Sequence, residues 1–120
     1  MSILDELAWR GLINDCTDTE ALTKRLGEGP VVLYCGFDPT ADSLHVGSLV
    51  PIMGLAHLQR NGQRVVALMG GGTAMIGDPS GKKGMRKMLT ETQLEENVLK
   101  IRPQMERFLN FSGNFELVNN

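Results

Sequence analysis

Two apolar runs constrain the fold of this chain more than any other feature. VVLYCGF (31–37) and RVVALMG (64–70) are rich in β-branched residues, and polar and apolar side chains do not alternate along either run. Such runs are typical of strands that are buried on both faces, as in a parallel sheet. Parallel neighbours need a long crossover, and residues 38–63 can supply one that contains a helix. The two runs therefore predict a βαβ unit.

Helix signals flank this unit on both sides. Ser2 with Asp5 three residues later indicates a capped helix start, and Gly62 follows the expected end of the crossover helix. Pro51 fits that helix only if it begins a few residues earlier. We expect helices at residues 2–14, 17–26, 46–61 and 91–109, the last with a kink at Pro103, and a third strand from residue 115.

This alternation of helices and strands predicts an α/β fold, a Rossmann-type parallel sheet with flanking helices. Three strands make about the first half of such a sheet. We expect residues 1–29 to form an N-terminal helical segment. Residues 30–120 are expected to form the first half of a Rossmann-type domain, truncated at its C-terminal end.

Composition narrows the class of protein. The chain has 120 residues and a net charge of −2, which argues against non-specific coating of nucleic acid and against anchoring to an acidic membrane. The two cysteines and two histidines lack the spacing of a zinc site or a disulfide framework. We therefore expect no protein-bound metal, no signal peptide, no membrane span and a reducing, cytoplasmic location. We expect His57 on a helix surface, and packing roles for Trp9, Met53, Met69, Met75 and Met88.

Two familiar phosphate motifs are absent. Residues 70–75, GGGTAM, lack the last glycine of a dinucleotide fingerprint. GDPSGKKG around Lys82 resembles a P-loop, but its first glycine is misplaced and Gly84 stands where a Ser or Thr would hold magnesium. On these motifs alone, we expect residues 70–84 to form a solvated, flexible loop.

The segment YCGFDPTADSLHVGS (34–48) is the strongest candidate for a site. It joins the end of a strand to a helix start, which is where open α/β sheets bind ligands. The helix start offers N–H groups and a positive dipole to a phosphate, and Gly47 leaves room for a flat group. Thr40 and His45 add a hydroxyl and an imidazole. The alternative that these two side chains only cap the helix stays open.

This segment, followed by GGGTAMIGDPSGKKGMRK, resembles the catalytic domain of class I aminoacyl-tRNA synthetases, in particular the bacterial tyrosyl-tRNA synthetases. His-Val-Gly-Ser stands at the signature written HIGH in that family. The resemblance covers essentially the whole chain, and two long motifs at matching separation are far more specific than the signature alone. It implies a tyrosine–tRNA ligase, which activates L-tyrosine with ATP to tyrosyl-adenylate and transfers it to tRNA(Tyr).

The resemblance also implies roles for individual residues. Tyr34 would reach the phenolic hydroxyl of bound tyrosine, and Asp78 its α-ammonium group. For Tyr34 the alternative is an ordinary core tyrosine. Residues implied to line the ATP or adenylate are Cys35, Gly36, Asp38, Thr40, His45, Gly47 and Ser48.

The implied catalytic residues all act on phosphate charge. Thr40 and His45 would stabilise the β and γ phosphates, while Lys82 and Arg86 would neutralise the departing pyrophosphate. Because the tyrosine carboxylate is already a nucleophile, the reaction needs no general base. That accounts for a sequence without a Ser/His/Asp or paired-carboxylate pattern.

Departures from the family limit what is expected of the chain by itself. Ser48 replaces the last His of HIGH, and the second half of the sheet and the KMSKS loop are missing. We expect a fragment that is inactive alone, from a protein that uses ATP with Mg²⁺, is a homodimer at full length, and binds tRNA(Tyr) through regions absent here. The alternatives are a non-catalytic nucleotide-binding module, one piece of a split assembly, or a different HIGH-type nucleotidyltransferase, against which Tyr34 with Asp78 argues.

Overall fold

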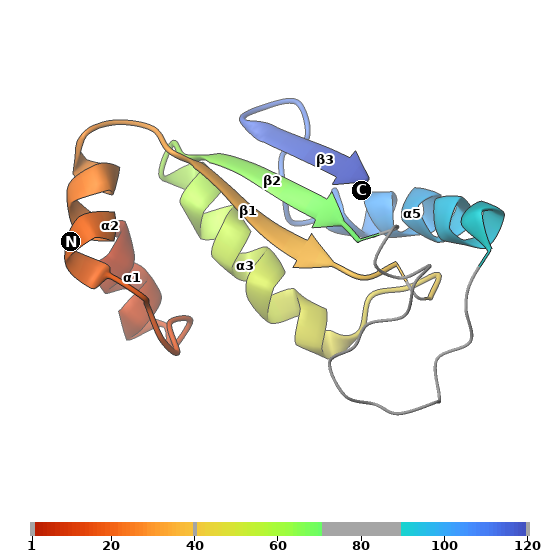
Figure 1. Cartoon of the computed structure of the whole chain (residues 1–120), viewed down its shortest axis with the longest axis horizontal. Coiled ribbons are helices and arrows are strands. Elements are labelled where there is room, and N and C mark those ends of the chain that lie inside the picture. The colour runs from red at the N-terminus through yellow and green to blue at the C-terminus, as the bar shows by residue number, and fades with distance from the viewer. Residues whose placement is uncertain (1, 40, 71–89, 120) are drawn as a thin grey trace.

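The computed structural model describes residues 2–39, 41–70 and 90–119. Helices and strands alternate along these ranges, as predicted (Figure 1). The helices are α1 (Ile3–Trp9), α2 (Thr19–Gly27), α3 (Val46–Arg60) and α5 (Glu91–Met105), and the strands are β1 (Val32–Phe37), β2 (Arg64–Met69) and β3 (Phe115–Asn119). The α/β fold class is confirmed.

The three strands form one parallel sheet in the order β1-β2-β3. Phe37 is paired with Met69, and Met69 with Asn119, so the carboxyl ends of all three strands lie at one edge. The segment that joins β1 to α3 leaves the sheet at this edge (Figure 1). A site built from that segment has one defined location in the fold.

Helices α3 and α5 cover one face of this sheet. Both connect neighbouring parallel strands, and right-handed crossovers in the same direction place their helices on the same side. The core lies between these helices and the sheet, with Met69 and Met105 both at 0% exposure. Its buried members are Phe37, Ile52, Leu55, Ala56, Val65, Ala67, Met69, Ile101, Met105, Leu109 and Phe115.

The prediction that β1 is buried on both faces is wrong. Leu33 and Cys35 are half-buried on the helix-covered side, but Val32 and Tyr34 on the opposite side are 63% and 74% exposed. Successive side chains of a strand point to opposite faces, so one face of β1 is open among the residues that the structure describes. An uninterrupted apolar run predicts that both faces of a strand are packed against other segments. It does not predict that those segments lie nearby in sequence. Tyr34 is therefore not a core tyrosine in this structure.

The N-terminal helices differ from their predicted bounds. Ser2 and Asp5 form the predicted capping box, but α1 ends at Trp9, and Gly11 follows with a φ of +73°. The cap of α2 is Asp18, whose side chain accepts a hydrogen bond from the N–H of Ala21 at 2.9 Å. The first helix is therefore shorter than its apolar pattern predicted, because a left-handed glycine ends it.

Two further side chains lie elsewhere than predicted. The His57 side chain is only 11% exposed, because α1 packs on α3 and brings Glu6 Oε1 to 3.8 Å from His57 Nδ1. Trp9 is 76% exposed and so has no packing role in this structure. Met69 is buried in the core and Met53 is half-buried, as expected. Met75 and Met88 lie outside the described residues.

The predictions for α3 and α5 are close to the structure. Helix α3 begins at Val46, and Gly62 follows its end with a φ of +93°. Thr90 forms a capping box with Gln93 at the start of α5. Helix α5 continues through Pro103 but ends at Met105, four residues before the predicted end at 109.

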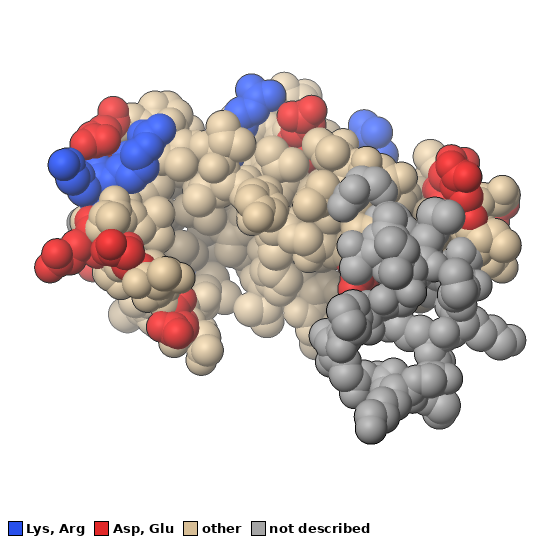
Figure 2. Space-filling view, viewed as in Figure 1, with Lys and Arg blue, Asp and Glu red and all other residues tan. Residues whose placement is uncertain are grey.

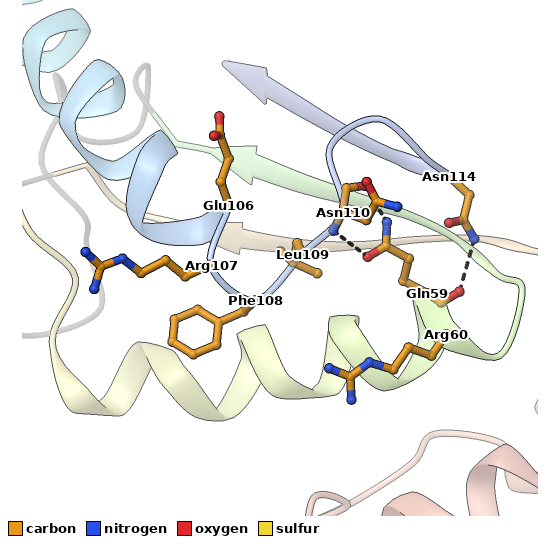
Figure 3. Close-up of a pocket in the computed structure, with 8 residues that line it drawn as sticks. All are labelled: Gln59, Arg60, Glu106, Arg107, Phe108, Leu109, Asn110 and Asn114. Atoms are coloured by element: carbon orange, nitrogen blue, oxygen red, sulfur yellow. Dashed lines mark hydrogen bonds between the residues drawn. The ribbon is translucent and has the colours of Figure 1, made fainter.

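An amide network fixes the end of α3 to the turn before β3 (Figure 3). The Gln59 side chain donates to the carbonyl of Asn110 at 2.7 Å and accepts from the Asn110 N–H at 2.9 Å. Asn114 donates to the carbonyls of Gln59 and Gln63. Gln59 is 9% exposed, so these bonds satisfy backbone groups that would otherwise lack partners. The network holds the crossover rigidly at the end far from the candidate site.

Candidate functional site

A cavity of about 290 Å³ lies where the carboxyl end of β1 meets the start of α3. It coincides with the segment that sequence patterns predicted as a site. The residues that line it are Gly36, Phe37, Asp38, Ala41, Ser43, Leu44, His45, Gly47, Ser48 and Pro51. Five of the predicted site residues are therefore brought together: Gly36, Asp38, His45, Gly47 and Ser48.

His45 lies at the N-cap position of α3 with an exposed side chain. Its backbone is extended, with φ −95° and ψ 171°, but its side chain makes no capping hydrogen bond. The alternative that His45 only caps the helix is therefore wrong for this structure. Thr40, the other residue in that alternative, lies outside the described residues. The imidazole is available to a ligand in the cavity.

Gly47 brings the His45 ring close to the first turn of the helix. A Cβ at Gly47 would lie 2.7 Å from His45 Cε1 and 2.9 Å from Nδ1. Any side chain at this position would push the ring away. The space expected above Gly47 is thus occupied by the imidazole in this structure. Gly47 lets His45 lie over the start of α3.

The start of α3 adds donors to the cavity. The first N–H groups of an α-helix have no partner within the helix, and the dipole of the helix gives this end a partial positive charge. The N–H of Ser48 is used locally, because it donates to the carbonyl of His45 at 3.0 Å. His45, Gly47 and Ser48 line the cavity, so the start of α3 borders it. The arrangement suits an anionic group such as phosphate.

Tyr34 and Cys35 lie on opposite faces of β1. The Tyr34 side chain is on the open face, and Cys35 packs against the helix-covered core. Burial raises the pKa of the Cys35 thiol above its ordinary value, so the group is a neutral thiol at physiological pH. A neutral thiol can hydrogen-bond a sugar hydroxyl but is a poor nucleophile. The two adjacent side chains can thus serve two different subsites.

Gly36 connects the open face to the cavity. By alternation it points to the same face as Tyr34, and it also lines the cavity at the start of α3. A Cβ at Gly36 would meet nothing within 4 Å in the part of the chain that the structure describes, so no described residue fills the space beside it. Among the described residues, no side chain near Gly36 separates a molecule against Tyr34 from the cavity.

Four predicted site residues lie outside the described residues, namely Thr40, Asp78, Lys82 and Arg86. Five lining residues were not predicted: Phe37, Ala41, Ser43, Leu44 and Pro51. They lie within or just after the same stretch of sequence, but small or apolar side chains carry no chemical signal of their own. Within residues 2–39, 41–70 and 90–119 there is no group of three or more His, Cys, Asp or Glu residues that could hold a metal ion.

The surface beside the site has little charge. Figure 2 shows charged side chains of the described residues at the two ends and along the top of the molecule, and an uncharged region in the middle of this face, over β1 and α3. The exposed apolar side chains of these two elements are Val32, Tyr34, Val46, Leu49 and Val50. None of the helices in the described ranges has the length and hydrophobicity needed to cross a membrane.

Comparison with protein families gives a match over residues 26–120, to the family described as tRNA synthetases class I (W and Y). Among curated proteins, the chain is 59% identical over 113 residues to a tyrosine–tRNA ligase of Opitutus terrae, a match that covers 94% of this chain and 27% of the relative. It is 55% identical over 119 residues to a tyrosine–tRNA ligase of Clostridium botulinum, covering 99% of this chain and 29% of that protein.

Solved structures give the same result. A C-terminally truncated mitochondrial tyrosyl-tRNA synthetase of Coccidioides posadasii superimposes with a TM-score of 0.80 at 32% identity, over 100% of this chain and 35% of that one. The corresponding Aspergillus nidulans structure also gives 0.80 at 32% identity, over 99% of this chain and 37% of that one. The chain thus spans less than a third of the length of these curated relatives.

Proposed function

This chain belongs to the class I tRNA synthetases of the W and Y type, and on that premise we propose that it is part of a tyrosine–tRNA ligase. The whole protein would activate L-tyrosine with ATP and transfer the product to tRNA(Tyr). The observation that carries this choice is the meeting of two subsites at Gly36. One is the exposed Tyr34 side chain, and the other is the cavity with His45 at the start of α3.

In the proposed first step, a carboxylate oxygen of tyrosine attacks the α-phosphorus of ATP. The new bond gives tyrosyl-adenylate, and the bond to the β-phosphate oxygen breaks to release pyrophosphate. No proton has to be removed from the nucleophile, so catalysis depends on positioning and on stabilising phosphate charge. In the second step, a ribose hydroxyl at the end of the tRNA attacks the carbonyl of this mixed anhydride. An ester bond to the ribose forms, the bond between the carbonyl carbon and the phosphate oxygen breaks to release AMP, and the hydroxyl proton is released.

We assign His45 and the N–H groups of α3 to the phosphates of ATP. Both supply hydrogen-bond donors, and the helix dipole favours negative charge at the same place. Gly36, Asp38, Gly47 and Ser48 line the cavity and would line the rest of the nucleotide, whereas Cys35 does not line the cavity and is assigned to the nucleotide from the sequence motif. Thr40 would join His45 at the β and γ phosphates, and Lys82 and Arg86 would neutralise the pyrophosphate; these three assignments rest on sequence motifs alone.

We assign Tyr34 to the amino acid. Its hydroxyl can hydrogen-bond a phenol, and its ring offers an apolar surface to the substrate ring. A site that hydrogen-bonds a substrate hydroxyl rejects the analogue lacking it, because its own polar group is then left without a partner. That principle is illustrated by tyrosyl-tRNA synthetase itself. Asp78 would bind the α-ammonium group of tyrosine.

The remaining parts of the proposal concern the whole protein. Residues 1–29 would be a helical segment, and residues 30–120 the first half of the catalytic domain. ATP would enter as its Mg²⁺ complex, with the metal as part of the substrate. We further propose a cytoplasmic homodimer whose tRNA-binding regions lie beyond the matched portion of the relatives.

Exchange of labelled pyrophosphate into ATP tests the proposed function. We expect the full-length protein to catalyse exchange when tyrosine is present, and not with tryptophan or phenylalanine. Tryptophan is the critical comparison, because the family includes enzymes for both amino acids. Exchange that depends on tryptophan, or the absence of exchange with every amino acid, would overturn the proposal.

A further inference from the structure

We infer that Asn97 and Gln104 of α5 are positioning residues that hold the turn between β1 and α3 in its nucleotide-binding shape. This inference rests on the proposed function. Neither residue lines the cavity, and each lies 58 to 62 positions in sequence after the turn residues that it contacts. They act through the backbone of the turn.

Asn97 holds the first part of the turn. Its side-chain Nδ2 donates to the carbonyl oxygen of Pro39 at 2.8 Å. Pro39 is among the fully buried residues, so its carbonyl group lies where water is scarce. A buried carbonyl with one side-chain partner depends on that partner. Asn97 therefore fixes the chain just after Asp38.

Gln104 holds the second part of the turn through two bonds. Its Oε1 accepts from the N–H of Leu44 at 3.0 Å, and its Nε2 donates to the carbonyl of Asp42 at 3.1 Å. One amide thus engages the backbone on both sides of Ser43. Leu44 directly precedes His45, so this clamp sets where the N-cap residue of α3 lies.

The two amides act from one rigid surface. Residues 97 and 104 are seven apart, about two helical turns, and so lie on the same side of α5. Lys100 lies between them and approaches Asp42 at 4.0 Å, an exposed pair that adds little. Helix α5 is itself anchored in the core by Ile101 and Met105, at 1% and 0% exposure. The turn is therefore tied to the core and not only to its own neighbours.

This arrangement gives the clamp a catalytic consequence. The proposed reaction depends on where donors lie relative to the phosphates, and a displacement of about 1 Å can cost roughly 10²-fold in rate. Tyr34 is held differently, because its backbone is paired with Val66 in the sheet. Loss of the clamp should therefore impair nucleotide chemistry and leave tyrosine binding intact.

The test uses Gln104→Met and Asn97→Leu in the full-length protein, with Glu95→Ala as a control at an exposed position of the same helix. Both clamp variants keep the approximate shape of the side chain and remove its polar atoms. We expect the turnover number of tyrosine-dependent exchange to fall by about tenfold to 10²-fold, with the dissociation constant of tyrosine changed by less than about twofold. Gln104→Glu can still accept from Leu44 but cannot donate to Asp42, so its rate should be intermediate.

Hydrogen exchange at the Leu44 amide reads the clamp without reference to activity. We expect faster exchange at Leu44 in Gln104→Met, and unchanged protection at Ala67 in the core. Wild-type rates of pyrophosphate exchange in both clamp variants would overturn the inference. So would a slower exchange accompanied by weaker tyrosine binding and a lower midpoint of unfolding, because the whole protein would then have been disturbed. If the wild-type protein shows no tyrosine-dependent exchange of pyrophosphate into ATP, the proposed function is wrong. The clamp is then tested by hydrogen exchange alone, and unchanged protection of the Leu44 amide in Gln104→Met would contradict it.

Discussion

Replacing His45 by alanine is expected to slow tyrosine-dependent pyrophosphate exchange by roughly 10²–10³-fold, the usual effect of removing one preorganised donor to developing charge. The side chain is exposed toward the cavity and makes no capping hydrogen bond, so its removal should not unravel α3. The effect should appear in the turnover number. The dissociation constant of tyrosine should stay unchanged, because Tyr34 does not line the cavity that His45 lines.

Two further variants sharpen this expectation. His45→Gln keeps a hydrogen-bond donor but cannot carry a positive charge, and should retain more activity than His45→Ala. Val46→Ala is the matched control, because the next side chain is 86% exposed and does not line the cavity. A His45→Ala protein with wild-type turnover would show that the imidazole has no part in the reaction. An equal loss in Val46→Ala would show that the helix start, and not His45, had been disturbed.

Replacing Gly36 by valine is expected to lower exchange by about 10²-fold or more, without loss of stability. The new side chain would project into the open space that joins the Tyr34 face to the cavity. The tyrosine carboxylate and the α-phosphate have to meet there. Valine favours strands and glycine weakens them, so the midpoint of unfolding should stay the same or rise. A variant that folds better and reacts worse would separate function from stability.

Glycine variants of graded size provide the control for this prediction. Gly36→Ala adds one methyl group and should have a smaller effect than Gly36→Val. Gly54→Ala is the matched change outside the site, since a Cβ at Gly54 in α3 also meets nothing within 4 Å. It should leave exchange unchanged. Full activity in Gly36→Val would mean that the two subsites do not meet at this residue.

Local sequence signals predicted most of the fold for identifiable reasons. The cap at Ser2 and the terminating Gly62 depend on a few neighbouring residues, so they are visible in a short stretch of sequence. The parallel sheet follows from apolar runs separated by a helix-length crossover. The ends of α1 and α5 were less predictable, because apolar periodicity continues past the last helical turn in both.

Features that depend on distant packing were not predictable in this way. The apolar run of β1 does not reveal that α3 and α5 cover the same face, so the exposure of Tyr34 came only from the structure. His57 was placed on a surface, because nothing in its neighbourhood shows that α1 packs against it. The roles of Asn97 and Gln104 were not predictable for the same reason. An amide side chain indicates no particular role in the sequence until its hydrogen-bond partners on another segment are known.

The sequence predicted where the site lies better than how it is arranged. The turn after β1 and the start of α3 were identified from strand, turn and helix signals together. The separation of Tyr34 and Cys35 onto opposite faces follows from strand alternation, but its significance depends on which face is open. The proposed role of Gly36 in joining the Tyr34 face to the cavity depends on knowing which face of β1 is open.

In the proposed enzyme, Tyr34 and His45 belong to one site that is joined past Gly36. The most direct measurement is a crystal structure of the full-length protein with a non-hydrolysable analogue of tyrosyl-adenylate. We predict that the phenol lies against Tyr34, that the phosphoryl group lies at the start of α3 beside His45, and that the linkage between them passes Gly36. An analogue bound elsewhere, or bound with its phenol and phosphoryl groups away from both residues, would contradict the account.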